Sequence, residues 1–134
     1  SSLALAILRE AMDGVVNHPL GTAYKARIEE VGLAMGGKTG TSQVRRISKS
    51  ERERGVLKNQ DRPWWERDHA VFIGYAPLEA PRYVAAVVVE HGGGGATVAA
   101  PIAHDILLQV QLRDPSRAGP VSPLAGVGAA GREL

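Results

Sequence analysis

The sequence predicts a mixed α/β fold of the α+β kind, in which antiparallel strands are packed by an N-terminal and a C-terminal helix. Apolar residues recur at helical spacing near both ends of residues 1–112. Between them lie two short runs rich in β-branched residues, Ala70–Tyr75 and Tyr83–Glu90. The turn-forming residues 76–81 separate these runs, which is typical of neighbouring antiparallel strands.

The first helix is predicted from Leu3 to about Asn17, where His18 and Pro19 end it. Its apolar stripe consists of Leu3, Ile7, Leu8, Ala11, Met12, Val15 and Val16. We expect this stripe to pack on a sheet. Residues 20–23 predict a turn, residues 26–33 fit either a short helix or a loop, and the first strand is predicted at about residues 34–44.

Residues 45–67 form a charged insertion between predicted strands, and Trp64 and Trp65 lie near its end. One interpretation is a surface for nucleic acid or another polyanion, with the tryptophans as stacking platforms. The other is a solvated extension of the hairpin, with both tryptophans folded onto the domain. We favour the second, because acids are mixed with bases and no second aromatic cluster follows.

The runs Ala70–Tyr75 and Tyr83–Glu90 are apolar at successive positions, so we expect both strands to be covered on both faces. Residues 92–95 predict a mobile glycine connection. The closing helix has Pro101 in its first turn, where the missing N–H costs little. Its predicted apolar face consists of Val98, Ile102, Ala103, Ile106, Leu107 and Val110. Residues 113–134 are rich in Pro, Gly and Ala and are expected to be a disordered tail.

The composition of the chain argues against several classes of function and site. The 134 residues carry a formal charge of +2, which is too small to imply a nucleic-acid partner. The sequence has no Cys, which excludes disulfides and thiolate metal sites. Its 4 histidines share no ligand spacing, so we predict neither a metal site nor a cofactor. His91 is the histidine to test as a participant in a site loop, although a structural role is favoured.

The run Gly36–Ser42 combines glycines, one lysine and several hydroxyl side chains, and it is the best candidate for a binding site. Glycines let a ligand approach the backbone, lysine supplies positive charge, and threonine hydroxyls supply hydrogen-bond donors. We interpret it as a strand in which alternation puts Thr39 and Thr41 on one side and Lys38 on the other. Its ligand would be a carboxylate, and Gly40 would leave room for a substrate backbone.

The same run also matches a phosphate loop, so nucleotide binding through Gly32 to Thr39 stays as the alternative. The pattern G-x-x-x-x-G-K-[ST] is met by Gly32, Gly37, Lys38 and Thr39. A phosphate loop needs a buried strand before it and a helix that begins at the lysine. Residues 25–30 are too charged for such a strand, and Gly40 disfavours such a helix. We therefore favour the carboxylate site.

On this motif and three later segments, the chain resembles the transpeptidase domain of the class B penicillin-binding proteins, whose third motif is Lys-Thr-Gly or Lys-Ser-Gly. The segments that carry the resemblance are residues 36–43, 68–77, 81–92 and 93–103. The likeness spans Leu3 to Leu112. The glycine run after His91 favours the elongation type, penicillin-binding protein 2, over the division type. The resemblance implies the C-terminal part of the fold shared with serine β-lactamases.

The family also needs a Ser-x-x-Lys motif for the nucleophile and its base, and a Ser-x-Asn motif across the cleft. None of the serines of this sequence has Lys three residues on or Asn two residues on. We therefore expect residues 1–112 to be the C-terminal portion of a transpeptidase domain, inactive by themselves. The rest of that domain, which would be a partner, and the family's membrane anchor would lie outside this chain.

The resemblance implies serine-type D,D-transpeptidation of peptidoglycan stem peptides, with β-lactams captured by the same acylation step. Lys38 would hold positive charge near the nucleophile, and Thr39 and Thr41 would bind the substrate carboxylate. The N–H of Thr41 would be one oxyanion donor, and Gly40 would keep the cleft open. The implied location is the periplasmic face of the bacterial inner membrane. Cell-elongation proteins are the implied further partners, and the tryptophan pair stays open as their docking site.

Overall fold

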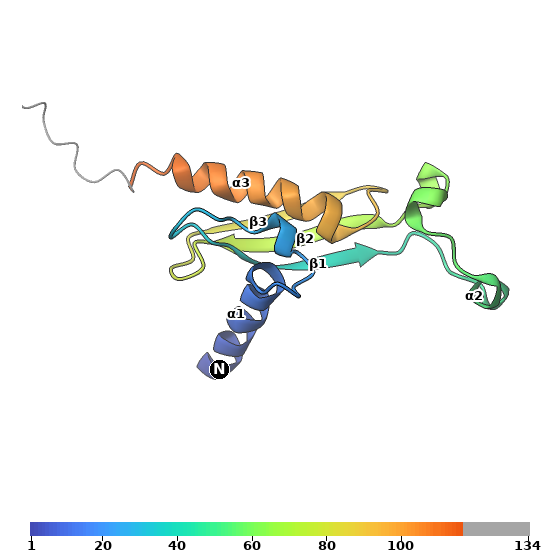
Figure 1. Cartoon of the computed structure of the whole chain (residues 1–134), viewed down its shortest axis with the longest axis horizontal. Coiled ribbons are helices and arrows are strands. Elements are labelled where there is room, and N and C mark those ends of the chain that lie inside the picture. The colour runs from blue at the N-terminus through green and yellow to red at the C-terminus, as the bar shows by residue number, and fades with distance from the viewer. Residues whose placement is uncertain (117–134) are drawn as a thin grey trace, which may run out of the picture.

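The computed structural model describes residues 1–116, which form a small sheet with helices on two sides (Figure 1). The helices and strands in chain order are α1 (Ser2–Asn17), β1 (Gly36–Ser42), α2 (Lys49–Arg54), β2 (His69–Ala76), β3 (Tyr83–Val89) and α3 (Ala100–Leu112). Short 3-10 turns lie at Tyr24–Ala26, Asn59–Asp61 and Trp64–Glu66, and a π-turn, η4 (Gly95–Ala99), leads into α3. The predicted order of helix, three strands and closing helix is confirmed.

The three strands form one antiparallel sheet in the order β1-β2-β3, with β2 in the centre. Lys38 of β1 lies opposite Ile73 of β2, and Val71 of β2 lies opposite Val88 of β3. The predicted hairpin of β2 and β3 is therefore confirmed. The first strand is shorter at both ends than the predicted residues 34–44.

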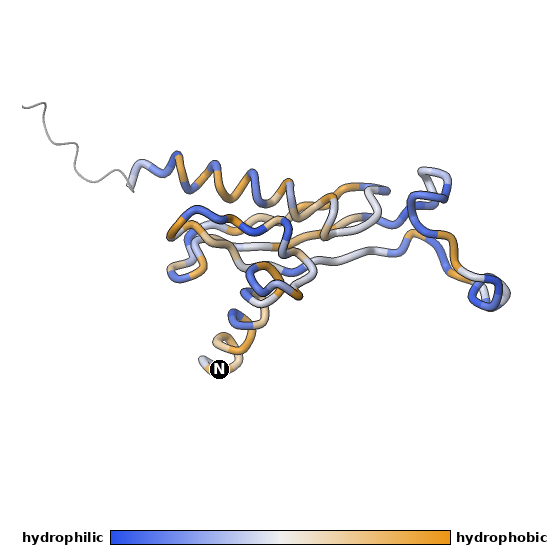
Figure 2. Tube along the Cα trace, in the orientation of Figure 1, coloured by the Kyte–Doolittle hydropathy of each residue, from blue (hydrophilic) through white to orange (hydrophobic). Residues whose placement is uncertain are grey.

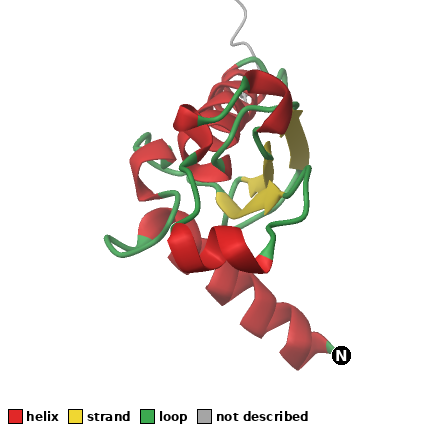
Figure 3. Ribbon diagram, turned by 90° about the vertical axis from the view of Figure 1, so that its right-hand side faces the viewer, coloured by secondary structure: helices red, strands yellow, loops and turns green. Residues whose placement is uncertain are grey.

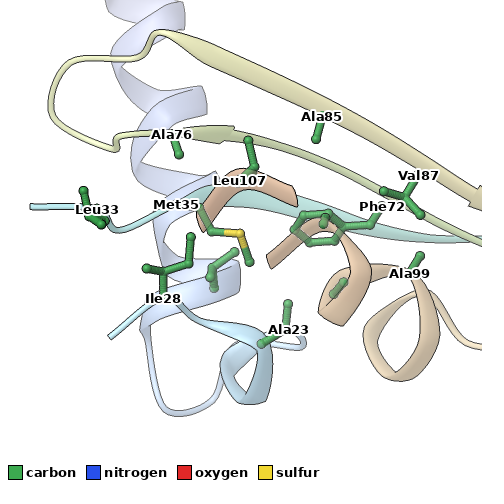
Figure 4. Packing of buried hydrophobic residues seen from close by; sticks show 14 of the residues in the cluster. Ala23, Ile28, Leu33, Met35, Phe72, Ala76, Ala85, Val87, Ala99 and Leu107 are labelled. Atoms are coloured by element: carbon green, nitrogen blue, oxygen red, sulfur yellow. The ribbon is translucent and has the colours of Figure 1, made fainter. Parts of the chain in front are cut away.

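The core lies between the sheet and α3, which runs along one face (Figure 1). Phe72 of β2, Met35 before β1 and Leu107 of α3 are its largest fully buried apolar side chains, and they converge in Figure 4. The predicted face of the closing helix is right at Ala103 and Leu107. It is wrong at Ile102 and Ile106, which are exposed. The face that α3 turns to the sheet consists of Ala100, Ala103, Leu107 and Gln111.

The expectation that β2 and β3 are covered on both faces is wrong. Ile73, Val84 and Val88 are 47%, 82% and 65% exposed. The reason is that α3 covers one face, whereas α1 reaches the other face mainly at β1 and then leads away from the sheet (Figures 1 and 3). A continuous apolar run therefore marks strands whose second face is uncovered within residues 1–116.

Helix α1 packs on the sheet only through its C-terminal end, where Val16 is fully buried. The prediction that the apolar stripe packs on the sheet is confirmed at this end of the helix, but it is wrong for the first half. The side chains of Leu3, Leu5, Ile7 and Leu8 are all more than half exposed. This half of α1 extends beyond the edge of the sheet, with the N-terminus at its far end (Figure 3).

The 45–67 insertion projects past the end of β1 as a charged arm that contains α2 (Figures 1 and 2). Asp68 links the two ends of this arm. One of its carboxylate oxygens accepts from the Val44 N–H at 3.4 Å, and the other lies 3.5 Å from Arg62 Nη1. Both members of this ion pair are buried. Trp64 and Trp65 are 58% and 66% exposed, so the expectation that both fold onto the domain is wrong.

No helix within residues 1–116 is long and apolar enough to cross a membrane. Of the predicted tail, residues 117–134 lie outside the described residues. Within residues 113–116, Asp114 is buried, and its carboxylate lies 2.8 Å from Arg82 Nη1 at the start of β3. This contact ties the C-terminal end of α3 to the sheet.

Candidate functional site

The residues of the candidate site lie on β1, which we call the site strand, at one edge of the sheet. Lys38 and Thr41 are exposed, and Thr39 and Gly40 are half-buried. One side of the strand pairs with β2 through all its residues. The other side has no strand partner within residues 1–116, so a ligand with an extended backbone can lie alongside it.

Alternation along the site strand separates the charge from the hydroxyls, as the sequence predicts. Thr39 lies opposite Phe72, whose side chain is in the core below α3. Lys38 lies opposite Ile73, whose side chain is on the other, exposed face. The nucleotide-binding alternative is wrong in its central requirement, because Lys38 lies inside a strand that continues to Ser42 and does not begin a helix.

Lys38 carries a charge that no carboxylate compensates within residues 1–116, since none of the ion pairs found there includes it. Its Nζ donates to the main-chain oxygen of Thr39 at 2.8 Å. An exposed ammonium on the same strand as two threonine hydroxyls favours the approach of an anion to this strand. A hydrogen bond between such a charged group and its partner contributes about 1.5 to 3 kcal/mol when water is excluded.

The glycines of the site strand differ in whether the surrounding residues leave room for a side chain. A Cβ on Gly37 would overlap the Phe72 ring, and a Cβ on Gly36 would lie 2.8 Å from the Tyr75 ring. A Cβ on Gly40 would instead meet only Val71, at an ordinary contact distance of 3.4 Å. Packing of the described residues therefore explains the first two glycines but not Gly40, as expected if Gly40 makes room for a ligand.

Two residues that the sequence did not single out contact the site strand. The Thr22 hydroxyl oxygen lies 3.0 Å from that of Thr39. Gly95 of η4 lies so close to the strand that a Cβ there would overlap the main-chain oxygens of Gly40 and Val71. Thr22 is in the predicted turn and Gly95 in the predicted glycine connection, and no local pattern reveals that either one folds back onto β1.

The glycine connection is anchored rather than free, contrary to the expectation of a mobile segment. The Gly93 N–H donates to the main-chain oxygen of Asp68 at 2.8 Å, and Gly95 is buried. Gly93 has φ +87°, a conformation that favours glycine. The connection thus holds η4 against the sheet at a fixed place.

His91 lies at the Ser42 end of the sheet, but the strand before it is not next to the site strand, since β2 lies between them. Its N–H donates to His69 Nδ1 at 2.8 Å, and its own Nδ1 lies 2.9 Å from the Arg67 main-chain oxygen. Its ring also lies 4.4 Å from the Trp64 ring, centroid to centroid. These contacts favour the structural role. Within residues 1–116, no group of His, Asp or Glu side chains could hold a metal ion.

The site strand thus presents one exposed ammonium and several hydroxyl side chains, but its sequence offers no paired nucleophile and base. Ser42 is the serine of the strand, and it belongs to no Ser-x-x-Lys sequence.

Comparisons with known proteins agree with this arrangement. Residues 1–108 match the family model described as the penicillin binding protein transpeptidase domain. The peptidoglycan D,D-transpeptidase MrdA of Haemophilus influenzae is 35% identical over 101 residues, which cover 74% of this chain and 14% of the relative. Stage V sporulation protein D of Bacillus subtilis is 37% identical over 105 residues, 75% of this chain and 14% of the relative.

Solved structures show the same fold. PBP2 of Helicobacter pylori, in its complex with MreC, is 29% identical with a TM-score of 0.64, and the match covers 81% of this chain and 17% of that one. PBP2 of Pseudomonas aeruginosa, in complex with WCK 5153, is 32% identical with a TM-score of 0.57. This match covers 80% of this chain and 19% of that one. The chain thus spans less than a fifth of the length of these relatives, and its architecture is that of one part of their transpeptidase domains.

Proposed function

The chain belongs to the penicillin-binding protein transpeptidase family, and we propose that it is the C-terminal part of a serine-type peptidoglycan D,D-transpeptidase of the elongation type. The observation that supports this most is that Lys38, whose ammonium has no carboxylate partner within residues 1–116, lies on the same open edge strand as Thr39 and Thr41. That arrangement suits the terminal carboxylate of a peptide, which an extended backbone brings alongside the strand.

The proposed reaction is acyl transfer in two steps. A serine Oγ from outside this chain attacks the carbonyl carbon between the two D-Ala residues of a stem peptide. The C–N bond breaks, the last D-Ala leaves with a proton on its amine, and an ester with the serine remains. The amine of a second stem peptide then attacks the ester, restores the serine and forms the cross-link. A β-lactam would be captured in the first step, when its ring amide opens.

The residues of this chain have distinct proposed roles in these steps. Thr39 and Thr41 donate hydroxyl hydrogen bonds to the substrate carboxylate. The Thr41 N–H helps to stabilise the oxyanion of the tetrahedral intermediate. Lys38 keeps positive charge near the serine and favours the neutral form of the family's catalytic lysine. Gly40 leaves space for the substrate backbone, in agreement with the ordinary contact distance of 3.4 Å that a Cβ there would have to Val71.

We infer a cell-wall context from the relatives. The Helicobacter pylori PBP2 was solved with MreC, and by likeness the protein that contains this chain would assemble with cell-elongation proteins. Its proposed location is the periplasmic face of the inner membrane, where peptidoglycan is cross-linked.

The Lys38 role is tested by penicillin acylation of the whole protein that contains this chain together with a Ser-x-x-Lys segment. Lys38→Ala should lower the second-order rate constant for covalent labelling by about 10²-fold or more, as for loss of other preorganised electrostatic groups. Lys58→Ala is the matched control, because Lys58 is exposed on the 45–67 insertion.

An unchanged rate in Lys38→Ala would refute the Lys38 role. The isolated chain should give no covalent adduct with penicillin, because none of its serines belongs to a Ser-x-x-Lys motif. A stable adduct on it would overturn the proposal that the nucleophile lies elsewhere.

A further inference from the structure

Thr22 lies in the turn that follows α1, and main-chain contacts fix that turn independently of the site strand. The Ala23 N–H donates to the Val15 oxygen at 3.0 Å, and the Tyr24 N–H donates to the Gly21 oxygen at 3.2 Å. Gly21 lies so close to the end of α1 that a Cβ would overlap the Val15 oxygen. The turn is therefore held against the end of α1, and this fixes the position of Thr22 next to Thr39 of β1.

The Thr22 side chain makes a single hydrogen bond within residues 1–116, to the Thr39 hydroxyl, with 3.0 Å between the oxygens. A hydroxyl has one proton to donate and can accept two hydrogen bonds. Either oxygen of this pair can be the donor when no ligand is bound. The direction of the bond decides whether the Thr39 proton is available to a ligand.

A carboxylate ligand fixes that direction, because a carboxylate only accepts hydrogen bonds. Thr39 can bind it only by donating its proton, and the Thr39 oxygen is then left to accept from Thr22. Donation by Thr22 also makes the Thr39 hydroxyl a stronger donor, since chains of hydrogen bonds polarise one another.

We propose that Thr22 is a positioning residue for substrate binding, which holds the Thr39 hydroxyl by donating to it and so directs the Thr39 proton at the ligand carboxylate. This inference rests on the proposed function, since it needs a carboxylate on the site strand. Thr22 itself does not touch the reacting atoms.

A purely structural role is the competing explanation, and the contacts of the site strand argue against it. Every residue of β1 pairs with β2, and Gly37 and Gly40 also pack against the core and η4. Both hydroxyls are at the surface. Removal of the Thr22 hydroxyl therefore leaves the strand in place and removes only the orientation of the Thr39 side chain.

The test is penicillin acylation of the whole protein with Thr22→Val, which keeps the shape of the side chain but removes its hydroxyl. Each variant is acylated with a penicillin and with the methyl ester of the same penicillin, which lacks the anionic carboxylate. Thr22→Val should lower the rate constant for the free acid about three- to tenfold, the equivalent of one hydrogen bond, and leave the ester rate unchanged. Thr22→Ser, which keeps the hydroxyl, should restore most of the free-acid rate.

Two further variants make the result decisive. Thr97→Val is the matched control: Thr97 is exposed, and within residues 1–116 its hydroxyl bonds only to the Gly94 oxygen, so both rates should stay at the wild-type value. In a protein that already carries Thr39→Val, Thr22→Val should have no additional effect.

Several results would overturn the positioning role. These are an unchanged free-acid rate in Thr22→Val, equal losses for acid and ester, or an undiminished effect in the Thr39→Val protein. Failure of the proposed function has a different signature. The wild-type protein would then not be acylated at all, or Thr39→Val would not affect the free-acid rate.

Discussion

At the scale of single residues, the site depends on where glycine, lysine and threonine fall along one strand. Lys38 and Thr39 are neighbours in sequence, but they lie on opposite faces of the sheet because side chains alternate along a strand. Gly40 follows, and a Cβ there would meet Val71 at an ordinary contact distance. These assignments follow from the sequence alone, because they need only the strand conformation.

Substitution of Gly40 tests the space beside the strand. Gly40→Val should keep the fold, since valine favours strands and the new Cβ would lie 3.4 Å from Val71 Cβ. Its branched side chain should block the substrate backbone and suppress penicillin labelling of the whole protein. The labelling rate of Gly40→Ala should lie between those of the wild type and Gly40→Val. The measurement is labelling rate together with thermal midpoint. Normal labelling of a folded Gly40→Val protein would contradict the proposed path of the substrate.

Asp114 gives a pH-dependent prediction. A hydrogen bond from Tyr83, then those from Ser116, and the nearby Arg82 lower the pKa of Asp114 from its ordinary 3.8 to about 2. A carboxyl whose pKa is lower in the folded state stabilises the fold above its unfolded pKa, and the effect is lost as the pH falls through the folded pKa. The stabilisation should be complete above about pH 4 and vanish towards pH 2.

The measurement for Asp114 is the thermal midpoint of the wild-type protein minus that of Asp114→Asn between pH 2 and pH 6. We expect the difference to be positive and largest above about pH 4, and to shrink as the pH falls towards 2. A difference that does not vary with pH would show that Asp114 does not stabilise the end of α3 through its charge.

At the scale of the elements, sequence patterns predicted which segments form helices and strands better than which faces are buried. Helical spacing found α1 and α3, and turn residues found the hairpin of β2 and β3. The buried face depends on what covers it, which is not a local property. Ile106 and Val88 are apolar yet exposed, because α3 turns other residues to the sheet and, within residues 1–116, α1 reaches the second face mainly at β1.

The residues that support the site strand were missed for the same reason. Thr22 and Gly95 are 17 and 55 positions away from the residues they contact, Thr39 and Gly40. A hydroxyl in a turn and a glycine in a glycine run are ordinary, and only the folded chain reveals their partners. The same holds for Trp64, which the sequence predicted to be folded onto the domain but which contacts His91 from the surface.

Gly95 tests how tightly η4 holds the site strand. A Cβ on Gly95 would overlap backbone atoms of Gly40 and Val71, so Gly95→Ala must push η4 and β1 apart. Such overpacking typically costs about 1–3 kcal/mol, and displacement of Gly40 should also slow penicillin acylation. Both are measured on the whole protein, by thermal unfolding and by labelling rate.

Gly94→Ala is the matched control for Gly95. Its Cβ would lie 3.0 Å from Thr97 Oγ1, the end of a side chain that can turn away. A Gly95→Ala protein that is as stable and as reactive as Gly94→Ala would show that contact between η4 and the strand does not position the site.

At the scale of the whole molecule, the described residues match one part of larger solved relatives. The outer face of β2 and β3 and the first half of α1 expose apolar side chains, and the chain covers less than a fifth of its solved relatives. Exposed apolar faces of this size mark surfaces that another part of a protein covers. This agrees with the proposal that the nucleophile and the remaining strands come from outside the chain.

We propose above that the site strand binds a carboxylate while a serine from outside the chain attacks the peptide. The most direct measurement is a crystal structure of the whole protein acylated by a penicillin. We expect the antibiotic carboxylate within hydrogen-bond distance, about 2.5–3.0 Å, of the Thr39 and Thr41 hydroxyl oxygens, alongside Gly40. A carboxylate bound away from β1, with both hydroxyls directed to other groups, would contradict it.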